Sequence, residues 1–168
     1  MKIIEKSIEL DGQKLTLQFG KLAQAVDSSV YATLGDTAVL VTVALGPENP
    51  NLDYFPLSVE YAEKLYAGGI IKGSRWVKRE GRPSDEAVLN GRIIDRSIRP
   101  LFPKTYKKQV QVVITLLSID GVNDPEVLSA IAVSTALSIS SIPWAGPISK
   151  VRVGYLTSSE KKESAFIL

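Results

Sequence analysis

The sequence predicts an α+β domain in which a mixed β-sheet carries its helices on one face. Short segments that alternate apolar and polar residues fill the first third of the chain, as half-buried strands do. A helix, an apolar strand and a second helix follow them. Because the strands come first in the sequence and the helices later, this architecture is favoured over one in which strands and helices alternate regularly. The 168 residues suit one domain, 1–168, with a core of its own.

Five strands are expected before the first helix. They span Lys2–Leu10, Lys14–Phe19, Ala25–Thr33, Thr37–Ala44 and Leu57–Ala62. Asp11-Gly12, between the first two, is the strongest short signal for a hairpin turn, and Leu34-Gly35-Asp36 marks a second turn. The three prolines of the segment Gly46–Pro56 predict a surface loop.

Both helices have clear start signals. Residues 67–83 hold four glycines and predict a long exposed loop, after which Ser84 is the expected N-cap of the first helix. Two acids follow Ser84, where the helix macrodipole favours them. The expected buried stripe of this helix consists of Leu89, Ile93 or Ile94, and Ile98. Asp124-Pro125 begins the second helix, whose many small residues predict close packing against the sheet.

The remaining segments are extended. Val110–Ile119 is almost wholly apolar, which is typical of a strand buried on both faces. Ile148–Leu156 and Ser164–Leu168 flank a polar turn and predict a final hairpin. Because natural domains rarely stop on an apolar strand, we expect this chain to be a fragment of a longer protein.

The composition excludes several classes of chemistry. The chain has neither cysteine nor histidine, so it can form no disulfide, thiolate nucleophile, imidazole base or imidazole metal site. No apolar run approaches the roughly 18 residues of a membrane span, and the charged start Met1–Lys6 is unlike a secretory signal. A cytoplasmic protein is the simplest interpretation.

Positive charge is concentrated between Lys72 and Lys108, a stretch that we call the basic belt. It contains eleven Lys or Arg residues against four acids, a local net charge of +7, while the whole chain carries +2. The rest of the chain must therefore be acidic. Such polarity predicts a polyanionic partner.

Seven residues of the basic belt are candidates for contact with a single-stranded nucleic acid. They are Trp76, Lys78, Arg79, Arg82, Arg92, Arg96 and Arg99. An aromatic side chain beside cations in a glycine-rich loop suits base stacking, although Trp76 could instead anchor the loop in the core. The three helical arginines, at positions i, i+4 and i+7, share a face and present planar donors suited to phosphate. The competing interpretation is a solvated face that Asp95 partly neutralises.

Asp120, Asp124 and Glu126 form the other acidic group of note. Their spacing does not match a calcium loop, and an N-cap role accounts for Asp124. We therefore assign no metal ligand in this chain.

Two motifs resemble the signature of the bacterial polynucleotide phosphorylases. They are Glu80-Gly81-Arg82-Pro83-Ser84 and the run Arg92–Pro103, which ends in Arg-Pro-Leu-Phe-Pro. Gly35–Val39, Tyr66–Gly69 and Gly146–Ile148 match in the same order. More narrowly, the whole chain is similar to the first of the two ribonuclease PH-like core domains of these enzymes.

This resemblance implies a ribonuclease PH-like fold, similar to domain 2 of ribosomal protein S5. It also implies a homotrimeric ring that threads single-stranded RNA to a phosphorolytic site. There inorganic phosphate releases nucleoside diphosphates from the RNA 3′ end, with a divalent metal such as magnesium. A second core domain and KH and S1 modules are expected in the full chain. Trp76–Arg79 corresponds to the family's constriction loop, with Val77 in place of a second aromatic residue.

In the family, the active site lies in the second core domain, where a serine-rich turn at a helix start holds phosphate. The corresponding segment here is Val122–Val127. Pro125 removes a backbone donor, and Asp124 and Glu126 place negative charge where phosphate would sit. We therefore expect this domain to guide RNA and to build the ring rather than to catalyse. Two alternatives stay open: a self-sufficient exoribonuclease of the ribonuclease PH type, and a non-catalytic S5-like module that binds structured RNA.

Overall fold

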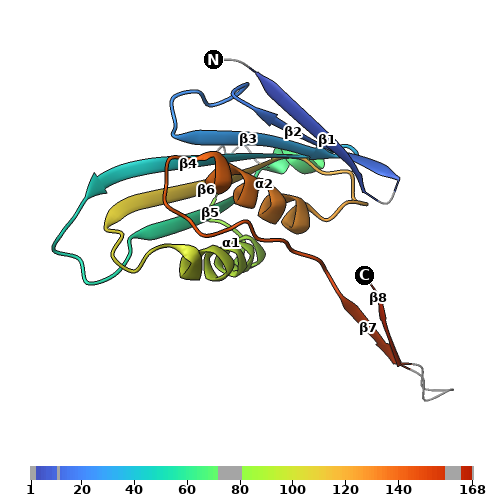
Figure 1. Ribbon diagram of the computed structural model, residues 1–168. Helices are drawn as coiled ribbons and strands as arrows, with labels where there is room; N and C mark the ends of the chain where they lie inside the picture. The colour runs from blue at the N-terminus through green and yellow to red at the C-terminus, as the bar shows by residue number, and fades with distance from the viewer. Residues whose placement is uncertain (1–2, 11, 72–80, 158–163, 168) are drawn as a thin grey trace.

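The computed structural model describes residues 3–10, 12–71, 81–157 and 164–167. Two helices cover one face of a six-stranded sheet, and a two-stranded hairpin projects from this body (Figure 1). The strands of the large sheet are β1 (Ile4–Leu10), β2 (Gln13–Phe19), β3 (Ser28–Leu34), β4 (Thr37–Glu48), β5 (Leu57–Glu63) and β6 (Lys108–Ser118). The other elements are α1 (Asp85–Ile98), α2 (Pro125–Ile139), the 3-10 turns η1 (Leu65–Gly68) and η2 (Arg99–Leu101), and the hairpin strands β7 (Gly154–Thr157) and β8 (Ser164–Ile167).

The large sheet is mixed. Its strand order is β1-β2-β3-β4-β6-β5, and every neighbouring pair is antiparallel except β5 and β6. Helix α1 connects this parallel pair and packs against the edge strand β5, while α2 packs across β3 and β4. The predicted fold class, α+β with a mixed sheet and both helices on one face, is confirmed.

Helix α2 packs closely on the sheet through small side chains, as its composition predicts. The small side chains buried on this helix are Ser129, Ala130, Ala132, Ser134 and Ala136, beside the larger Leu128, Val133 and Leu137. The hydroxyl of Ser28 on β3 donates to the carbonyl oxygen of Ala136 at 2.8 Å. Within the described residues, no helix has the length and apolarity that crossing a membrane requires.

Three expectations about the strands are corrected. The even-numbered residues Val110 to Leu116 of β6 are buried, but the residues between them are partly exposed, because helices cover only one face of the sheet. Strand β4 continues to Glu48, through a register shift after Leu45, into the stretch expected to be a loop. The final hairpin begins at Gly154 rather than Ile148, and its turn lies outside the described residues.

Helix α1 buries part of the hydrophobic stripe that its pattern predicts. Its buried residues are Ala87, Asn90, Gly91, Ile94 and Ile98. Ile94 and Ile98 of the expected stripe are therefore confirmed, whereas Leu89 and Ile93, the alternative to Ile94, are 56% and 46% exposed. The helix therefore presents apolar side chains to solvent on its outer side.

Asp120 ties the turn between β3 and β4 to the start of α2. Its Oδ1 accepts hydrogen bonds from the backbone N–H groups of Val122 and Asn123, both at 2.8 Å. Its Oδ2 accepts from the Asp36 N–H at 3.2 Å and from Asn123 Nδ2 at 2.5 Å. The Asp120 N–H donates to Thr37 Oγ1 at 3.2 Å. Led by those from Asn123, the bonds to the carboxylate hold the pKa of Asp120 well below its usual range.

An aromatic cluster fixes the chain after α1. The ring of Phe102 lies 4.7 Å from that of Phe55 and 6.5 Å from that of Trp144, between centroids, and Tyr106 packs edge-on against Phe55 at 5.8 Å. Trp144 Nε1 donates to the carbonyl oxygen of Ile98 at 3.3 Å. The segment that follows the last helical arginine is therefore held in place by packing.

Candidate nucleic-acid interface

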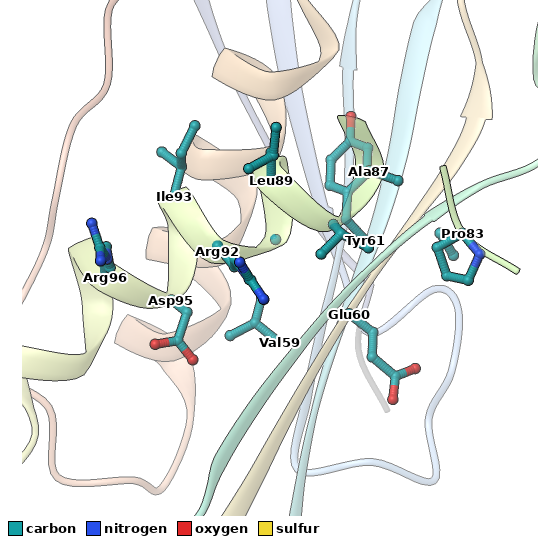
Figure 2. A pocket seen from close by; sticks show the side chains of 13 residues that line it. Val59, Glu60, Tyr61, Pro83, Ala87, Leu89, Arg92, Ile93, Asp95 and Arg96 are labelled. Atoms are coloured by element: carbon teal, nitrogen blue, oxygen red, sulfur yellow. The ribbon is translucent and has the colours of Figure 1, made fainter. Parts of the chain in front are cut away.

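A groove runs between the edge strand β5 and the outer side of α1 (Figure 2). Its volume is about 760 Å³. Apolar side chains in its lining include Val59, Ala87, Val88, Leu89 and Ile93. Four charged side chains stand among them, namely Glu60, Arg92, Asp95 and Arg96.

Two features hold α1 close to β5. The Ser84 hydroxyl accepts a hydrogen bond from the Ala87 N–H at 3.0 Å, which confirms the predicted N-cap, and it donates to Glu63 at the end of β5, also at 3.0 Å. On the second turn of the helix, a Cβ at Gly91 would lie 3.4 Å from the carbonyl oxygen of Val59. The helix and the strand approach closely because no side chain separates them there.

Arg92 and Arg96 are exposed on α1, and both line the groove. Neither forms an ion pair or a side-chain hydrogen bond with any other described residue. In Figure 2, Asp95 lies between the two arginines along α1, and all three residues line the groove. Each guanidinium therefore offers its charge and its planar set of donors to a ligand.

Arg99 is arranged differently, because its guanidinium is engaged within the domain. Its Nε and Nη2 donate to Oδ1 and Oδ2 of Asp95, both at 2.6 Å. Its Nη1 and Nη2 donate to the carbonyl oxygens of Phe55 and Leu57 at 3.2 and 3.1 Å. The hydrogen bond to Asp95 raises the pKa of Arg99 above its usual value. Contact between Arg99 and a nucleic acid stays a prediction, whereas its link between α1 and β5 is observed.

A second hollow, of about 510 Å³, adjoins the groove at the start of α1. Arg82 lines it and is exposed. Ile70 and Gly81, which stand on either side of the segment 72–80, line it as well. Trp76, Lys78 and Arg79 lie outside the described residues, so their contact with nucleic acid stays a prediction.

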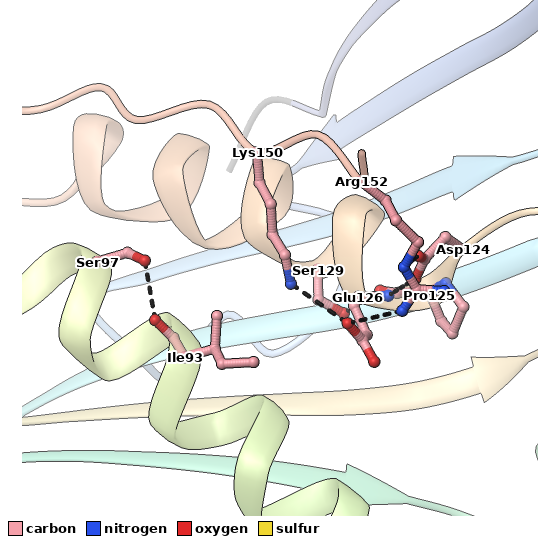
Figure 3. Close-up of polar contacts among 8 residues, drawn as sticks. All are labelled: Ile93, Ser97, Asp124, Pro125, Glu126, Ser129, Lys150 and Arg152. Atoms are coloured by element: carbon pink, nitrogen blue, oxygen red, sulfur yellow. Dashed lines mark hydrogen bonds and ion pairs between the residues drawn. The ribbon is translucent and has the colours of Figure 1, made fainter. Parts of the chain in front are cut away.

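The start of α2 is filled by the domain's own charged groups (Figure 3). Asp124 accepts a hydrogen bond from the Glu126 N–H at 2.8 Å, which confirms its N-cap role. Arg152 reaches Asp124 Oδ2 at 3.0 Å and Glu126 Oε2 at 3.2 Å, and Lys150 lies 3.4 Å from the same Glu126 oxygen. Both acids are therefore paired with cations of the segment that leads to β7.

This helix start fits neither a phosphate ion nor a resident metal. Pro125 has no N–H group, and the next N–H, that of Glu126, is already bonded to Asp124. An anion would also meet two carboxylates. The described part of the chain holds no group of three or more metal-ligating side chains close enough to bind an ion.

The comparison with protein families agrees with the sequence motifs. Residues 11–143 match the family described as "3' exoribonuclease family, domain 1". The chain belongs to this family. Among its relatives, the polyribonucleotide nucleotidyltransferase of Thermomicrobium roseum is 50% identical over 156 residues, covering 92% of this chain and 20% of the relative. The polyribonucleotide nucleotidyltransferase of Brucella suis is 53% identical over 150 residues, which cover 89% of this chain and 21% of the relative.

A third relative, from Xanthobacter autotrophicus, is 48% identical over 175 residues, which cover 99% of this chain and 24% of the relative. It carries the same enzyme name. This exoribonuclease-family domain thus spans between 20% and 24% of the length of these three relatives. The resemblance to the polynucleotide phosphorylases is confirmed.

Two solved structures confirm the ribonuclease PH-like fold. An Archaeoglobus fulgidus exosome with RNA bound to the active site matches with a TM-score of 0.60 at 21% identity, over 97% of this chain and 65% of that one. Rice Rrp46 matches with a TM-score of 0.58 at 13% identity, over 98% of this chain and 67% of the Rrp46 chain. At these identities the likeness concerns the fold alone.

Sequence reasoning missed two features of this exoribonuclease-family domain, one in the candidate interface and one at the start of α2. The exposed apolar residues Leu89 and Ile93 alternate with Arg92 and Arg96 at positions i, i+3, i+4 and i+7, so the spacing that aligned the arginines could have revealed them. Lys150, which pairs with an acid 24 residues earlier, carried no signal, because only folding brings the two together.

Proposed function

We propose that this chain is the first core domain of a polynucleotide phosphorylase, and that it guides single-stranded RNA rather than catalysing its cleavage. The relatives are named polyribonucleotide nucleotidyltransferase, which is the systematic name of polynucleotide phosphorylase, and they extend far beyond the part that this chain covers. The whole protein would be a cytoplasmic homotrimer with a second core domain and KH and S1 modules. It would release nucleoside diphosphates from the RNA 3′ end, with inorganic phosphate as co-substrate and a divalent metal such as magnesium.

One observation carries the RNA-binding part of the proposal, namely the outer face of α1. We call this surface the arginine face and define it as Leu89, Arg92, Ile93 and Arg96. All four side chains are exposed, and all four line the groove beside β5. Guanidinium groups bind phosphate oxygens through paired N–H donors, and apolar side chains offer contact to bases. The two arginines lie about 6 Å apart along the helix axis, so neighbouring phosphates of one strand can occupy them.

The start of α2 supports the non-catalytic part. Pro125 supplies no backbone donor, the Glu126 N–H is already bonded to Asp124, and the two acids are paired with Lys150 and Arg152. We expect no nucleoside diphosphate when the domain is incubated with RNA and inorganic phosphate. Release of diphosphate would instead favour the self-sufficient ribonuclease PH-type enzyme.

The arginine face is tested by the double variant Arg92→Gln/Arg96→Gln. Affinity for a single-stranded oligoribonucleotide would be measured by fluorescence anisotropy at several salt concentrations. Each phosphate contact contributes about 0.7 to the slope of log affinity against log salt for single strands. Loss of two contacts should therefore reduce the slope by about 1.4.

The matched control is Lys6→Gln/Lys14→Gln, which removes two positive charges from β1 and β2 at the opposite edge of the sheet. It should leave the slope close to that of the wild type. An unchanged slope in Arg92→Gln/Arg96→Gln would refute RNA binding by the arginine face. Stronger binding of duplex RNA than of single strands would favour the S5-like module.

A further inference from the structure

Arg99 and Asp95 form a clamp between the two walls of the groove. The four hydrogen bonds of the Arg99 guanidinium go to both oxygens of Asp95 and to two carbonyl oxygens at the start of β5. Arg99 thus joins the C-terminal end of α1 to the edge strand. Both oxygens of the Asp95 carboxylate accept a hydrogen bond from Arg99 at 2.6 Å, so Arg99 neutralises the negative charge of Asp95.

The position of Asp95 makes this pairing important for the arginine face. Asp95 lines the same groove as Arg92 and Arg96, and its side chain is 22% exposed. It stands three residues after Arg92, a spacing at which helical side chains form ion pairs. Without Arg99, the carboxylate would be available to neutralise Arg92 and would face the phosphates of a bound strand.

We infer that Arg99 is a positioning residue for RNA, which keeps Arg92 and Arg96 available to phosphates by holding the Asp95 carboxylate. The inference rests on the proposed function of the arginine face. It assigns Arg99 an action through Asp95, with no direct contact to RNA.

A rescue experiment separates this role from direct contact. Arg99→Met removes the clamp and leaves Asp95 charged, so affinity for a single-stranded oligoribonucleotide should fall about fivefold. Of this, roughly twofold comes from an ion pair with Arg92, and the rest from repulsion of phosphate. Asp95→Asn/Arg99→Met removes the unpaired charge and should return the affinity to within about twofold of the wild type. Lys14→Met, which removes one positive charge from β2, serves as the control.

The outcomes distinguish three roles of Arg99. Restored affinity in the double variant supports the inference, because Asp95→Asn restores neither a contact between Arg99 and RNA nor the hydrogen bonds of the clamp. Equal losses in Arg99→Met and in the double variant would overturn it, and so would an Arg99→Met variant that binds RNA as the wild type does. Thermal unfolding of each variant shows how much stability the clamp contributes.

A further variant keeps the test decisive if Arg99→Met folds poorly. Arg99→Lys retains a cation beside Asp95 but cannot reproduce the fork of donors to β5. Its melting temperature should fall while its RNA affinity stays within about twofold of the wild type. An affinity loss as large as that of Arg99→Met would count against the inference. Failure of the proposed function looks different, since Arg92→Gln/Arg96→Gln would then also bind RNA normally.

Discussion

Replacing Gly91 with alanine should stabilise the domain without changing its affinity for RNA. Gly91 lies within α1, where glycine costs roughly 0.8–1.0 kcal/mol relative to alanine. The added Cβ would lie 3.4 Å from the carbonyl oxygen of Val59 and 3.7 Å from Cβ of Tyr61, which are contact distances that a methyl group tolerates. We therefore expect the free energy of unfolding to rise by about 1 kcal/mol, or about 2–4 °C in melting temperature.

A larger side chain at the same position should have the opposite effect. In Gly91→Leu the branched end must enter the contact between α1 and β5, and overpacking of this kind costs typically 1–3 kcal/mol. The helix must also move away from the strand, which would shift the arginine face relative to β5. RNA affinity should therefore fall in Gly91→Leu and stay unchanged in Gly91→Ala.

Urea denaturation followed by circular dichroism measures both stabilities, and anisotropy with a single-stranded oligoribonucleotide measures the binding. A Gly91→Ala variant that is less stable than the wild type by 1 kcal/mol or more would show that α1 lies nearer to β5 than described. Equal stability of the alanine and leucine variants would show that the two elements are not in close contact. Either result would refute the reasoning.

Two further predictions concern the supporting structure. Gly35→Ala should lower the free energy of unfolding by about 2 kcal/mol, because φ is +57° and the new Cβ would lie 2.6 Å from Asn123 Nδ2 and 2.9 Å from Asp120 Oδ2. Gly12→Ala is the control, because its φ is +73° but nothing lies within 4 Å of the added Cβ. In urea titrations its free energy of unfolding should fall by only about half as much. Equal losses in the two variants would contradict a clash at Gly35. Burial raises the pKa of Tyr61 from 10.0 to about 12. The stability that its neutral form contributes is therefore complete below pH 10.0 and is lost as the pH rises towards about 12. Between about pH 8 and about pH 11, the wild type should lose about 1 kcal/mol more than Tyr61→Phe; parallel losses would contradict the raised pKa.

Local signals predicted the starts of both helices correctly. Ser84 and Asp124 are N-caps in the structure, because capping depends on backbone N–H groups two or three residues away. On the inward face of α1, the sequence predicted Ile98 correctly and Leu89 wrongly, and of the alternatives Ile93 and Ile94 it is Ile94 that is buried. The small size of Gly91 lets α1 approach β5 closely and so decides which side of the helix is buried. A pattern of hydrophobic residues contains no information about such a contact.

The candidate site was predicted in part. The sequence aligned three arginines on one helix face, and the structure leaves Arg92 and Arg96 in the groove. Arg99 differs from Arg92 and Arg96 because its guanidinium donates to two carbonyl oxygens at the start of β5. Those oxygens lie 42 and 44 residues earlier in the chain, so no local pattern could reveal them.

The sequence by itself determined the order of the elements, the helix caps, the concentration of positive charge and the family. These depend on neighbouring residues or on motifs that are read directly. Only the tertiary structure decided which arginines are free, which apolar residues of α1 remain exposed, and that Lys150 and Arg152 neutralise the start of α2. The physical reason is that the exposure and the pairing of a side chain depend on its neighbours in space. Folding takes many of those neighbours from distant parts of the chain.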